Sequence, residues 1–152
     1  MNTKRSLGAK LRIPLIVIVV VYLAAATYLY VFQRSFVFKP SGALAAPAEK
    51  GLSGVEVVEL DAADGIGLSA WYAQASQSGK PTFLYLHGNA GNMSSRANRF
   101  AMILEGGYGL LALSYRGYPG SGGAPSEEAF ISDGVLAYDW LNERAENIVV
   151  YG

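Results

Sequence analysis

Residues 82–92 read TFLYLHGNAGN, a short apolar run that ends in a turn rich in glycine and asparagine. Such a run, here Thr82–Leu86, is typical of a strand that is covered on both faces, as in a parallel sheet. Beyond the turn, apolar residues recur at helical spacing over residues 93–105. The sequence therefore predicts a strand, a loop and a helix, with Asn92 as the N-cap and Gly106-Gly107 as the stop.

The same alternation continues on both sides of this stretch. Residues 108–114 (YGLLALS) and 148–151 (IVVY) predict two more buried strands, and a helix capped by Ser126 is expected between them. Upstream, residues 55–60 and 66–73 predict an antiparallel hairpin. The order of a hairpin followed by β-α-β-α-β predicts an α/β fold, in which helices cover a parallel sheet and the hairpin adds two strands at one edge.

Residues 13–32 (IPLIVIVVVYLAAATYLYVF) carry no charge. About 20 apolar residues in a helix cross the ~30 Å hydrocarbon core of a bilayer. The segment predicts either an uncleaved signal anchor or a cleaved signal peptide with its site in Ala24–Ala26. The apolar run continues beyond these alanines, which favours the anchor and makes the lipid bilayer an expected partner. Pro14 is expected in the first turn of this helix, where a missing N–H costs least.

The charges are distributed unevenly around the apolar segment. The chain has 12 basic and 12 acidic residues, but no acid precedes residue 13. The basic residues nearest the segment are Lys4, Arg5, Lys10 and Arg12 before it, and Arg34 and Lys39 after it. The positive-inside rule then predicts a cytoplasmic N-terminus of residues 1–12 and a domain on the periplasmic or outer side. Residues 33–54, rich in proline and small residues, are expected to be a linker.

Composition excludes several classes of site. The chain has no cysteine and one histidine, His87, so disulfides, thiolate catalysis and zinc–thiolate sites are ruled out. No metal or other cofactor is expected. Outside the N-terminus no basic cluster occurs, so a nucleic-acid partner is not expected either.

Three segments together resemble consecutive signatures of the α/β-hydrolase superfamily. They are residues 83–92 (FLYLHGNAGN), 114–127 (SYRGYPGSGGAPSE) and 148–152 (IVVYG). With the apolar segment and residues 32–40 (FQRSFVFKP), the chain is most similar to single-pass, membrane-anchored members that have a serine-aminopeptidase-like domain. The resemblance covers nearly the whole chain. It implies a serine hydrolase that acts on the ester, thioester or peptide bond of a small-molecule or acyl substrate, with this chain supplying the N-terminal half of the sheet.

The resemblance also assigns roles to the turn after residues 82–86. It implies that the backbone N–H of Asn89 is one donor of an oxyanion hole, which stabilises the tetrahedral intermediate of acyl transfer. Gly88 would let the backbone come close, and His87 would orient the loop rather than act as the general base. Without the resemblance, HGNAGN is equally well explained as an ordinary turn between a strand and a helix.

Residues 115–123 (YRGYPGSGG) have two readings of equal weight. One is a loop at the active-site rim, with Arg116 and Tyr118 as lining; the other is a long connection that its glycines permit. A phosphate cradle is disfavoured, because the glycine spacing fits no such motif and two prolines interrupt the entry to the helix. Asp133, on the helix that follows, is expected to be a solvated surface residue.

The nucleophile of this fold is a serine in a G-x-S-x-G elbow, followed along the chain by the acid and the histidine. By its position Gly152 is the first glycine of that elbow, which would place the serine two residues further on. No serine of the chain fits the pattern, no serine follows Ser132, and His87 precedes the elbow. We therefore expect residues 55–152 to be a truncated hydrolase domain, with no catalytic residue present and inactive as written. The alternative is a non-catalytic, membrane-tethered remnant that associates through the exposed edge strand 148–151.

Overall fold

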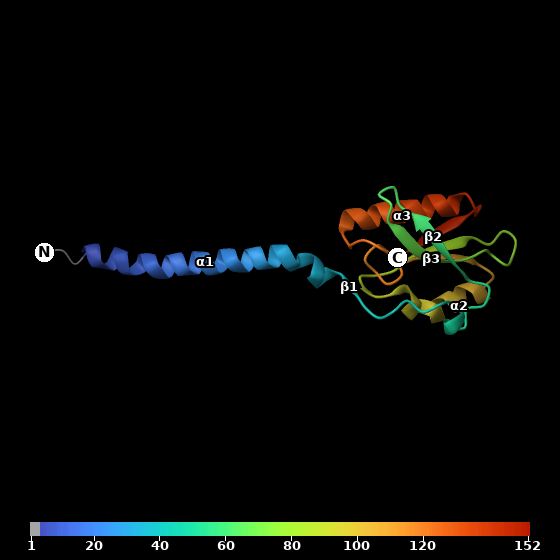
Figure 1. The fold of residues 1–152 in the computed structure, drawn as a ribbon, viewed down its shortest axis with the longest axis horizontal. Coiled ribbons are helices and arrows are strands. Elements are labelled where there is room, and N and C mark those ends of the chain that lie inside the picture. Colours follow the sequence, from blue (N-terminus) through green and yellow to red (C-terminus); the bar gives the residue numbers. More distant parts are fainter. Residues whose placement is uncertain (1–3) are drawn as a thin grey trace. The chain divides into compact units, whose positions relative to one another are not determined.

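The computed structural model describes residues 4–152. The chain divides into an N-terminal unit that ends at Val37 and a compact domain of residues 38–152. Helix α1 (Lys4–Val37) forms the first unit (Figure 1). Over Leu11–Val37 it is long and apolar enough to cross a membrane, and its side chains there are exposed. The prediction of one N-terminal apolar helix is thus confirmed.

Helix α1 extends beyond the predicted apolar segment at both ends. Pro14 was expected in the first turn, but it lies inside the helix, ten residues after its start at Lys4. There the proline ring removes one intrahelical hydrogen bond. The helix begins earlier because the basic residues and leucines before Pro14 are good helix formers.

Residues 33–54 differ from the expected linker. Their first part ends α1, and the remainder lies on the compact domain. Strand β1 (Lys39–Pro40) pairs in parallel with strand β5 (Ala90–Gly91), and Leu52 is buried in the apolar core. A short 3₁₀ helix, η1 (Ala48–Lys50), lies between β1 and Leu52. Small residues and prolines here serve close packing and backbone pairing rather than flexibility.

The domain is built on a five-stranded mixed sheet. Its strands are β2 (Glu56–Asp61), β3 (Gly67–Ala73), β4 (Thr82–Leu86), β6 (Gly109–Leu113) and β7 (Ile148–Tyr151). Their order in the sheet is β2-β3-β6-β4-β7. The hairpin β2–β3 is antiparallel and joins β6 in antiparallel fashion, whereas β4 is parallel to both of its neighbours. The α/β fold with a hairpin at one edge is confirmed.

Helices α2 (Ala97–Glu105) and α3 (Glu127–Asn142) lie on opposite faces of this sheet (Figure 1). The helix predicted over residues 93–105 starts with the 3₁₀ turn η2 (Met93–Arg96) before it becomes α-helical. Ser126 caps α3 as predicted, because its Oγ accepts the backbone N–H of Ala129 at 3.2 Å.

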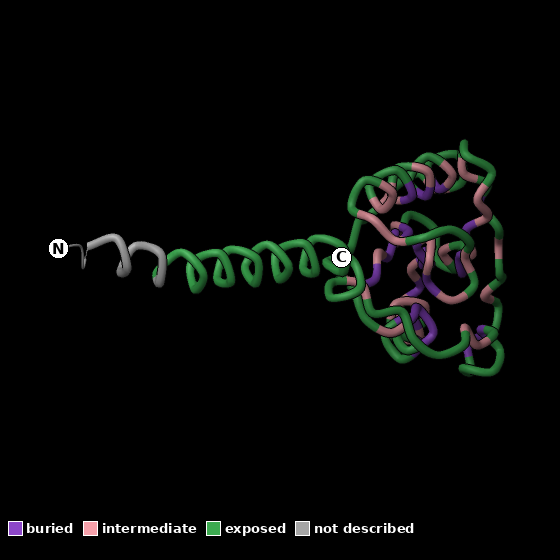
Figure 2. Tube along the Cα trace, turned by 60° about the vertical axis from the view of Figure 1, so that its left-hand side comes forward, coloured by how far each residue is buried: buried purple, intermediate pink, exposed green. Residues whose placement is uncertain are grey.

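The core consists of two layers, one on each face of the sheet. Side chains alternate between the faces along each strand. Leu111 and Leu113 of β6 pack with α3, whereas Leu110 and Ala112 pack with α2. Figure 2 shows the buried residues concentrated in the sheet and on the inner sides of these helices. All five residues of β6, the middle strand, are buried, so this strand fixes the positions of the loops that follow it and its neighbours.

Candidate functional site

The loop after β4 lies at the edge of the sheet where three parallel strands end. In the sheet register Leu86 of β4 pairs with Leu113 of β6, and Tyr85 pairs with Tyr151 of β7. The residues that follow these strands therefore meet at one edge. Gly152 is close to the end of β4, since a Cβ built on it would lie 3.8 Å from the carbonyl oxygen of Leu86. Ligands bind at this carboxyl edge in open α/β sheets.

His87 is buried at the base of the loop and bonds on both ring nitrogens. Its Nε2 lies 3.4 Å from the backbone nitrogen of Tyr115, and its Nδ1 lies 2.8 Å from the carbonyl oxygen of Gly88. A backbone N–H can only donate, so Nε2 is the acceptor and Nδ1 carries the proton that it donates to Gly88. Burial lowers the pKa of His87, and the charge of Arg96 lowers it further, while the bond to Gly88 opposes them. The imidazole is thus a neutral part of the loop.

The bond from His87 to Gly88 has a consequence for Asn89. The carbonyl of Gly88 and the N–H of Asn89 belong to one planar, trans peptide unit and point in opposite directions. A hydrogen bond that fixes the Gly88 carbonyl therefore also fixes the direction of the Asn89 N–H. A Cβ built on Gly88 would meet no atom within 4 Å, so the space beside the Cα of Gly88 is open.

The carbonyl of Asn89 is held by two donors from distant parts of the chain. The backbone N–H of Lys39 donates to it at 2.8 Å, and the hydroxyl of Tyr118 donates to it at 2.7 Å. Tyr118, expected as lining of the active-site rim, is almost fully buried and supports the loop through this bond. Burial raises the pKa of its hydroxyl, which keeps it protonated as a donor.

Arg116, the other residue expected at the rim, forms an ion pair with Asp133 of α3. Its backbone N–H donates to Oδ2 of Asp133 at 3.1 Å and its Nε donates to Oδ1 at 2.9 Å. A third nitrogen, Nη2, also donates to Oδ1. Asp133 was expected to be solvated, but this is wrong, because its exposed fraction is 0%. The carboxylate lies on the inner face of α3, where a cation from the preceding loop neutralises it.

A second carboxylate extends this pair to the hairpin. Nη1 of Arg116 donates to Oδ2 of Asp64, in the turn between β2 and β3, at 2.7 Å. The bond to Arg116 lowers the pKa of Asp64, and Asp133 holds the pKa of the guanidinium far above its usual range. Because one guanidinium bonds to both the hairpin and α3, the loop that follows β6 is fixed in position.

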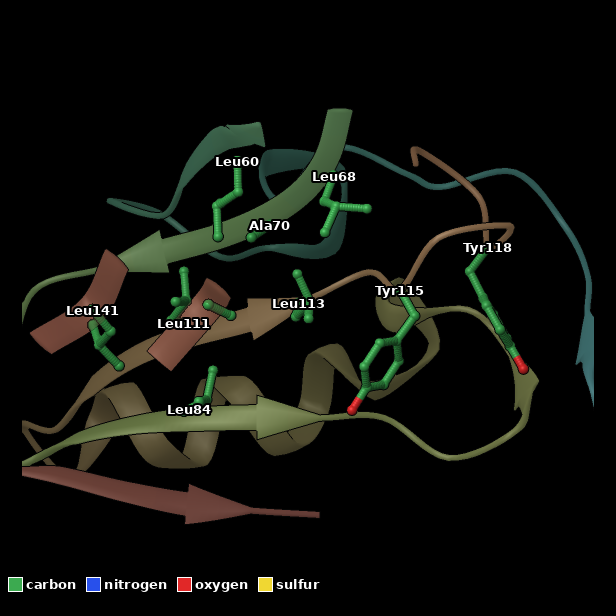
Figure 3. Close-up of a cluster of buried hydrophobic side chains, with 10 residues drawn as sticks. Leu60, Leu68, Ala70, Leu84, Leu111, Leu113, Tyr115, Tyr118 and Leu141 are labelled. Carbon is green, nitrogen blue, oxygen red and sulfur yellow. The ribbon is translucent and has the colours of Figure 1, made fainter. Parts of the chain in front are cut away.

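Aromatic rings fill the space under the loop. The ring of Phe130 stacks on Tyr115 with centroids 4.4 Å apart, and His87 lies 4.6 Å from Tyr118. Figure 3 shows Tyr115 and Tyr118 beyond the arrowhead of the strand that carries Leu113, on the side where β4 also ends. Burial, followed by the charge of Asp133, raises the pKa of Tyr115 to about 12. Neutral rings thus surround the imidazole.

Two surface hollows lie away from this loop. One is lined by residues of β4, α2 and β7, including Phe83, Met102 and Tyr151. The other lies beside the Arg116–Asp64 ion pair. Within residues 4–152, no cluster of three or more His, Cys, Asp or Glu side chains could hold a metal ion.

Solved structures share this architecture. An esterase of Pyrococcus furiosus aligns with 75% of this chain and 46% of its own, with a TM-score of 0.62 and 22% identity. An alpha-beta hydrolase of Vibrio vulnificus aligns with 66% of this chain and 35% of its own, with a TM-score of 0.57 and 24% identity. The domain has an α/β-hydrolase fold. At these identities the likeness establishes the fold of the hydrolase-like domain alone.

Curated relatives show distant homology. An uncharacterized protein of Mycobacterium tuberculosis is 33% identical over 135 residues, which are 86% of this chain and 48% of that protein. Lysophosphatidylserine lipase ABHD12 of Danio rerio is 38% identical over 76 residues, which are 49% of this chain and 20% of the lipase. No protein-family model matches the chain. The chain therefore spans about half the length of the first relative and a fifth of the second.

Two features of the hydrolase-like domain were not predicted. One is the buried partner of Arg116, for which a signal existed: Asp133 lies three residues after Phe130 and four before Ala137, on the apolar face of α3. The other is the pairing of β1 with β5, for which two residues per strand give no readable pattern.

Proposed function

We propose that this chain supplies the anchor and one oxyanion donor of a membrane-anchored serine hydrolase, which cleaves an acyl bond in lipid-like substrates. The observation that carries the proposal is the fixed Gly88–Asn89 peptide. His87 holds its carbonyl end, and the next carbonyl, that of Asn89, is held by Lys39 and Tyr118. Backbone donors held rigidly in this way stabilise an oxyanion without reorganising during the reaction.

The chemistry needs a nucleophile at the same edge of the sheet. In this fold the serine follows a strand in a G-x-S-x-G elbow, and its following N–H is the second oxyanion donor. Gly152 follows β7 beside the end of β4. A continuation that reads x-Ser-x-Gly after Gly152 would therefore place the serine at the same edge of the sheet as the Gly88–Asn89 peptide. The acid and the general base would come from later segments.

The substrate class rests on the names of the relatives. ABHD12 of Danio rerio is a lysophosphatidylserine lipase, and the Pyrococcus furiosus protein is an esterase. None of the proteins named above is called an aminopeptidase, so we place ester bonds of amphiphilic lipids ahead of peptide bonds. The serine-aminopeptidase-like subgroup stays a prediction from sequence.

The proposed setting is a single-pass anchor. Residues 13–32 would cross the bilayer, with residues 1–12 in the cytoplasm and the hydrolase-like domain on the periplasmic or outer side. Helix α1 has the required length and an exposed apolar surface, and four basic residues precede the segment. A cleaved signal peptide would leave the same domain free of the membrane.

A fluorophosphonate probe tests the proposed function, because it reacts only with an activated serine. The gene is first read past codon 152 for an in-frame x-Ser-x-Gly. We expect the extended protein to label and its elbow Ser→Ala variant not to label, and the chain of residues 1–152 also not to label. Labelling of the 152-residue chain would contradict the proposal, as would an extended protein that has the elbow serine and stays unlabelled.

A second candidate function is a non-catalytic, membrane-tethered module. It is favoured by the apolar edge strand β7, whose last three residues are exposed. In that case the chain would bind a partner through this edge, and the fluorophosphonate probe would label neither the 152-residue chain nor the extended protein. The absence of x-Ser-x-Gly after codon 152 would favour this second function.

A further inference from the structure

The segment that directly follows α1 is bonded to the candidate oxyanion loop by backbone pairing. The N–H of Lys39 donates to the carbonyl of Asn89 at 2.8 Å, and the N–H of Ser41 donates to the carbonyl of Gly91 at 3.1 Å. These bonds are the parallel ladder of β1 and β5. The loop thus has a neighbouring strand from a segment about fifty residues earlier in the chain.

Asn92 adds a side-chain connection to the same segment. Its Nδ2 donates to the carbonyl of Ser41 at 2.8 Å and to that of Ala43 at 3.4 Å, while its Oδ1 accepts the hydroxyl of Ser94 at 2.6 Å. Asn92 is buried, so losing it would leave two carbonyl oxygens with one partner fewer. One amide side chain therefore connects residues 41–43 to the end of the loop.

Phe38 provides the third connection. Its ring meets the ring of Phe130 edge-on, with centroids 4.9 Å apart. Phe130 stacks on Tyr115, whose backbone N–H is the donor to His87. The first residue after α1 thus packs on the aromatic group that holds the imidazole.

We propose that residues 38–45, here called the post-helix segment, position the candidate oxyanion loop and tie it to the membrane surface. The inference rests on the proposed function, in which the N–H of Asn89 is an oxyanion donor. Without the segment, the Asn89 carbonyl would lose one of its two donors and residue 91 would lose its backbone partner. Of the bonds described above, the loop would keep those of His87 to the Gly88 carbonyl and of Tyr118 to the Asn89 carbonyl.

Chain connectivity alone sets how far the loop can lie from the anchor. Two residues, Phe38 and Lys39, lead from the end of α1 at Val37 to the bond with Asn89. Two extended residues span at most about 7 Å. The hydrogen bond adds 2.8 Å, so the Asn89 carbonyl oxygen stays within about 10 Å of Val37 whatever angle the helix takes. The site would therefore act on an acyl group at the level of the lipid headgroups, as an amphiphile in the bilayer presents it.

A spin label on the full chain tests the positioning role. The chain has no cysteine, so Gly88→Cys gives a single labelling site, and a Cβ there meets no atom within 4 Å. The labelled chain in phosphatidylcholine vesicles is compared with its Asn92→Ala form. Asn98→Ala, an exposed asparagine on α2, is the control. Amide hydrogen exchange of β4 and β6 reports the integrity of the sheet in each sample.

The expected result is a local loosening. In Asn92→Ala the label becomes more mobile and the amides of residues 88–91 exchange roughly tenfold faster, while β4 and β6 stay protected. Asn98→Ala behaves as the parent. An unchanged label and loop would overturn the proposal. Loss of protection throughout the sheet would overturn it too, because Asn92 would then act on general stability and not on the loop.

The connection to the membrane is tested by the relaxation of the spin label through collisions with paramagnetic molecules, either oxygen in the lipid or a nickel chelate in the water. The comparison site is Ser78→Cys, in the exposed loop that precedes β4 and therefore at the other end of that strand from Gly88. Lipid-soluble oxygen is expected to relax a label at position 88 more than a label at position 78. A nickel chelate in the water is expected to show the opposite order. Equal relaxation of the two labels by oxygen and by the nickel chelate would overturn the proposal that the segment keeps the loop at the membrane surface. These readouts need no catalysis, so their failure and the failure of probe labelling are distinguishable.

Discussion

At the scale of single residues, the ion pair of Arg116 and Asp133 connects the loop after β6 to α3. The carboxylate is fully buried, and its hydrogen-bond partners are groups of Arg116. Without Asp133, Arg116 would have Asp64, whose side chain is half exposed, as its remaining charged partner in the described pair of bonds. The pair therefore links the loop after β6 to α3.

Asp133→Asn is predicted to lower the free energy of unfolding by about 1–3 kcal/mol, because the charge-assisted hydrogen bonds between Arg116 and α3 would be weakened while Asp64 stays as a charged partner. Asp139→Asn, an exposed position on the same helix, is the control and should change it by less than about 0.5 kcal/mol. Urea unfolding in detergent micelles, followed by circular dichroism, measures both. Equal effects of the two substitutions would contradict a stabilising pair.

His87 makes stability depend on pH in a defined direction. Its pKa in the folded chain is below the ordinary 6.5, because burial disfavours the charged form. Well above pH 6.5 the ring is neutral in both states. As the pH falls below this value, the unfolded chain takes up the proton first, so the free energy of unfolding decreases until the folded pKa is passed.

The prediction is a loss of stability between pH 7 and pH 5.5 that His87→Gln abolishes. The chain has one histidine, so a single imidazole resonance in the NMR spectrum reports its protonation directly. That resonance should titrate with a midpoint below 6.5. A midpoint at or above 6.5 would show that the ring does not act as the neutral, doubly bonded group described here.

Some residues of the candidate site could be placed from the sequence and others could not. The positions of His87, Gly88 and Asn89 after a buried strand could be predicted, because the apolar run and the glycines are local signals. The burial of Asp133 was missed, since a charged residue on a helix is usually solvated. Its partner Arg116 lies seventeen residues earlier, at a separation that no helical or strand period connects.

At the scale of elements, the two edge strands of the sheet differ in their protection. Strand β2 (EVVELD) carries three acids, whereas β7 (IVVY) carries no charge. Charged residues on an edge strand oppose pairing with another chain. The free side of β7 is thus the surface at which the 152-residue chain is expected to self-associate.

Val150→Lys tests this expectation, because it places a charge on the exposed face of β7. We predict that it lowers the self-association of the 152-residue chain, measured by sedimentation in detergent micelles over a range of protein concentrations. Val57→Lys on β2 is a matched control, since both valines are 57% exposed. A parent chain that stays monomeric at all concentrations, or equal effects of both lysines, would contradict the prediction.

Element positions were largely readable from the sequence, because each strand and helix has its own apolar period and its own turn residues. The strands over residues 82–86 and 148–151 have the predicted bounds, and the others differ by a residue or two. The pairing of β1 with β5 could not be predicted from the sequence. It depends on two segments that meet only after the sheet has formed, and its partners are backbone groups, which leave no trace in the sequence.

At the scale of the whole molecule, helix α1 and the domain are separate units joined at Val37. The predicted orientation places residue 6 in the cytoplasm and residue 78 on the far side of the membrane. Ser6→Cys and Ser78→Cys variants of this cysteine-free chain can be treated in intact spheroplasts with a maleimide that does not cross membranes. We expect labelling at position 78 alone. Labelling at position 6 alone would reverse the orientation.

The strand order β2-β3-β6-β4-β7 has a consequence for synthesis on the ribosome. Strands β3 and β4 are neighbours in the chain, but β6 lies between them in the sheet. At about 5–20 residues per second, the interval between the emergence of Ala73 and that of Leu113 lasts about 2–8 s. During that interval the nascent hairpin and β4 have no partner between them. A chaperone or the translocation channel would then have its greatest effect before β6 is complete.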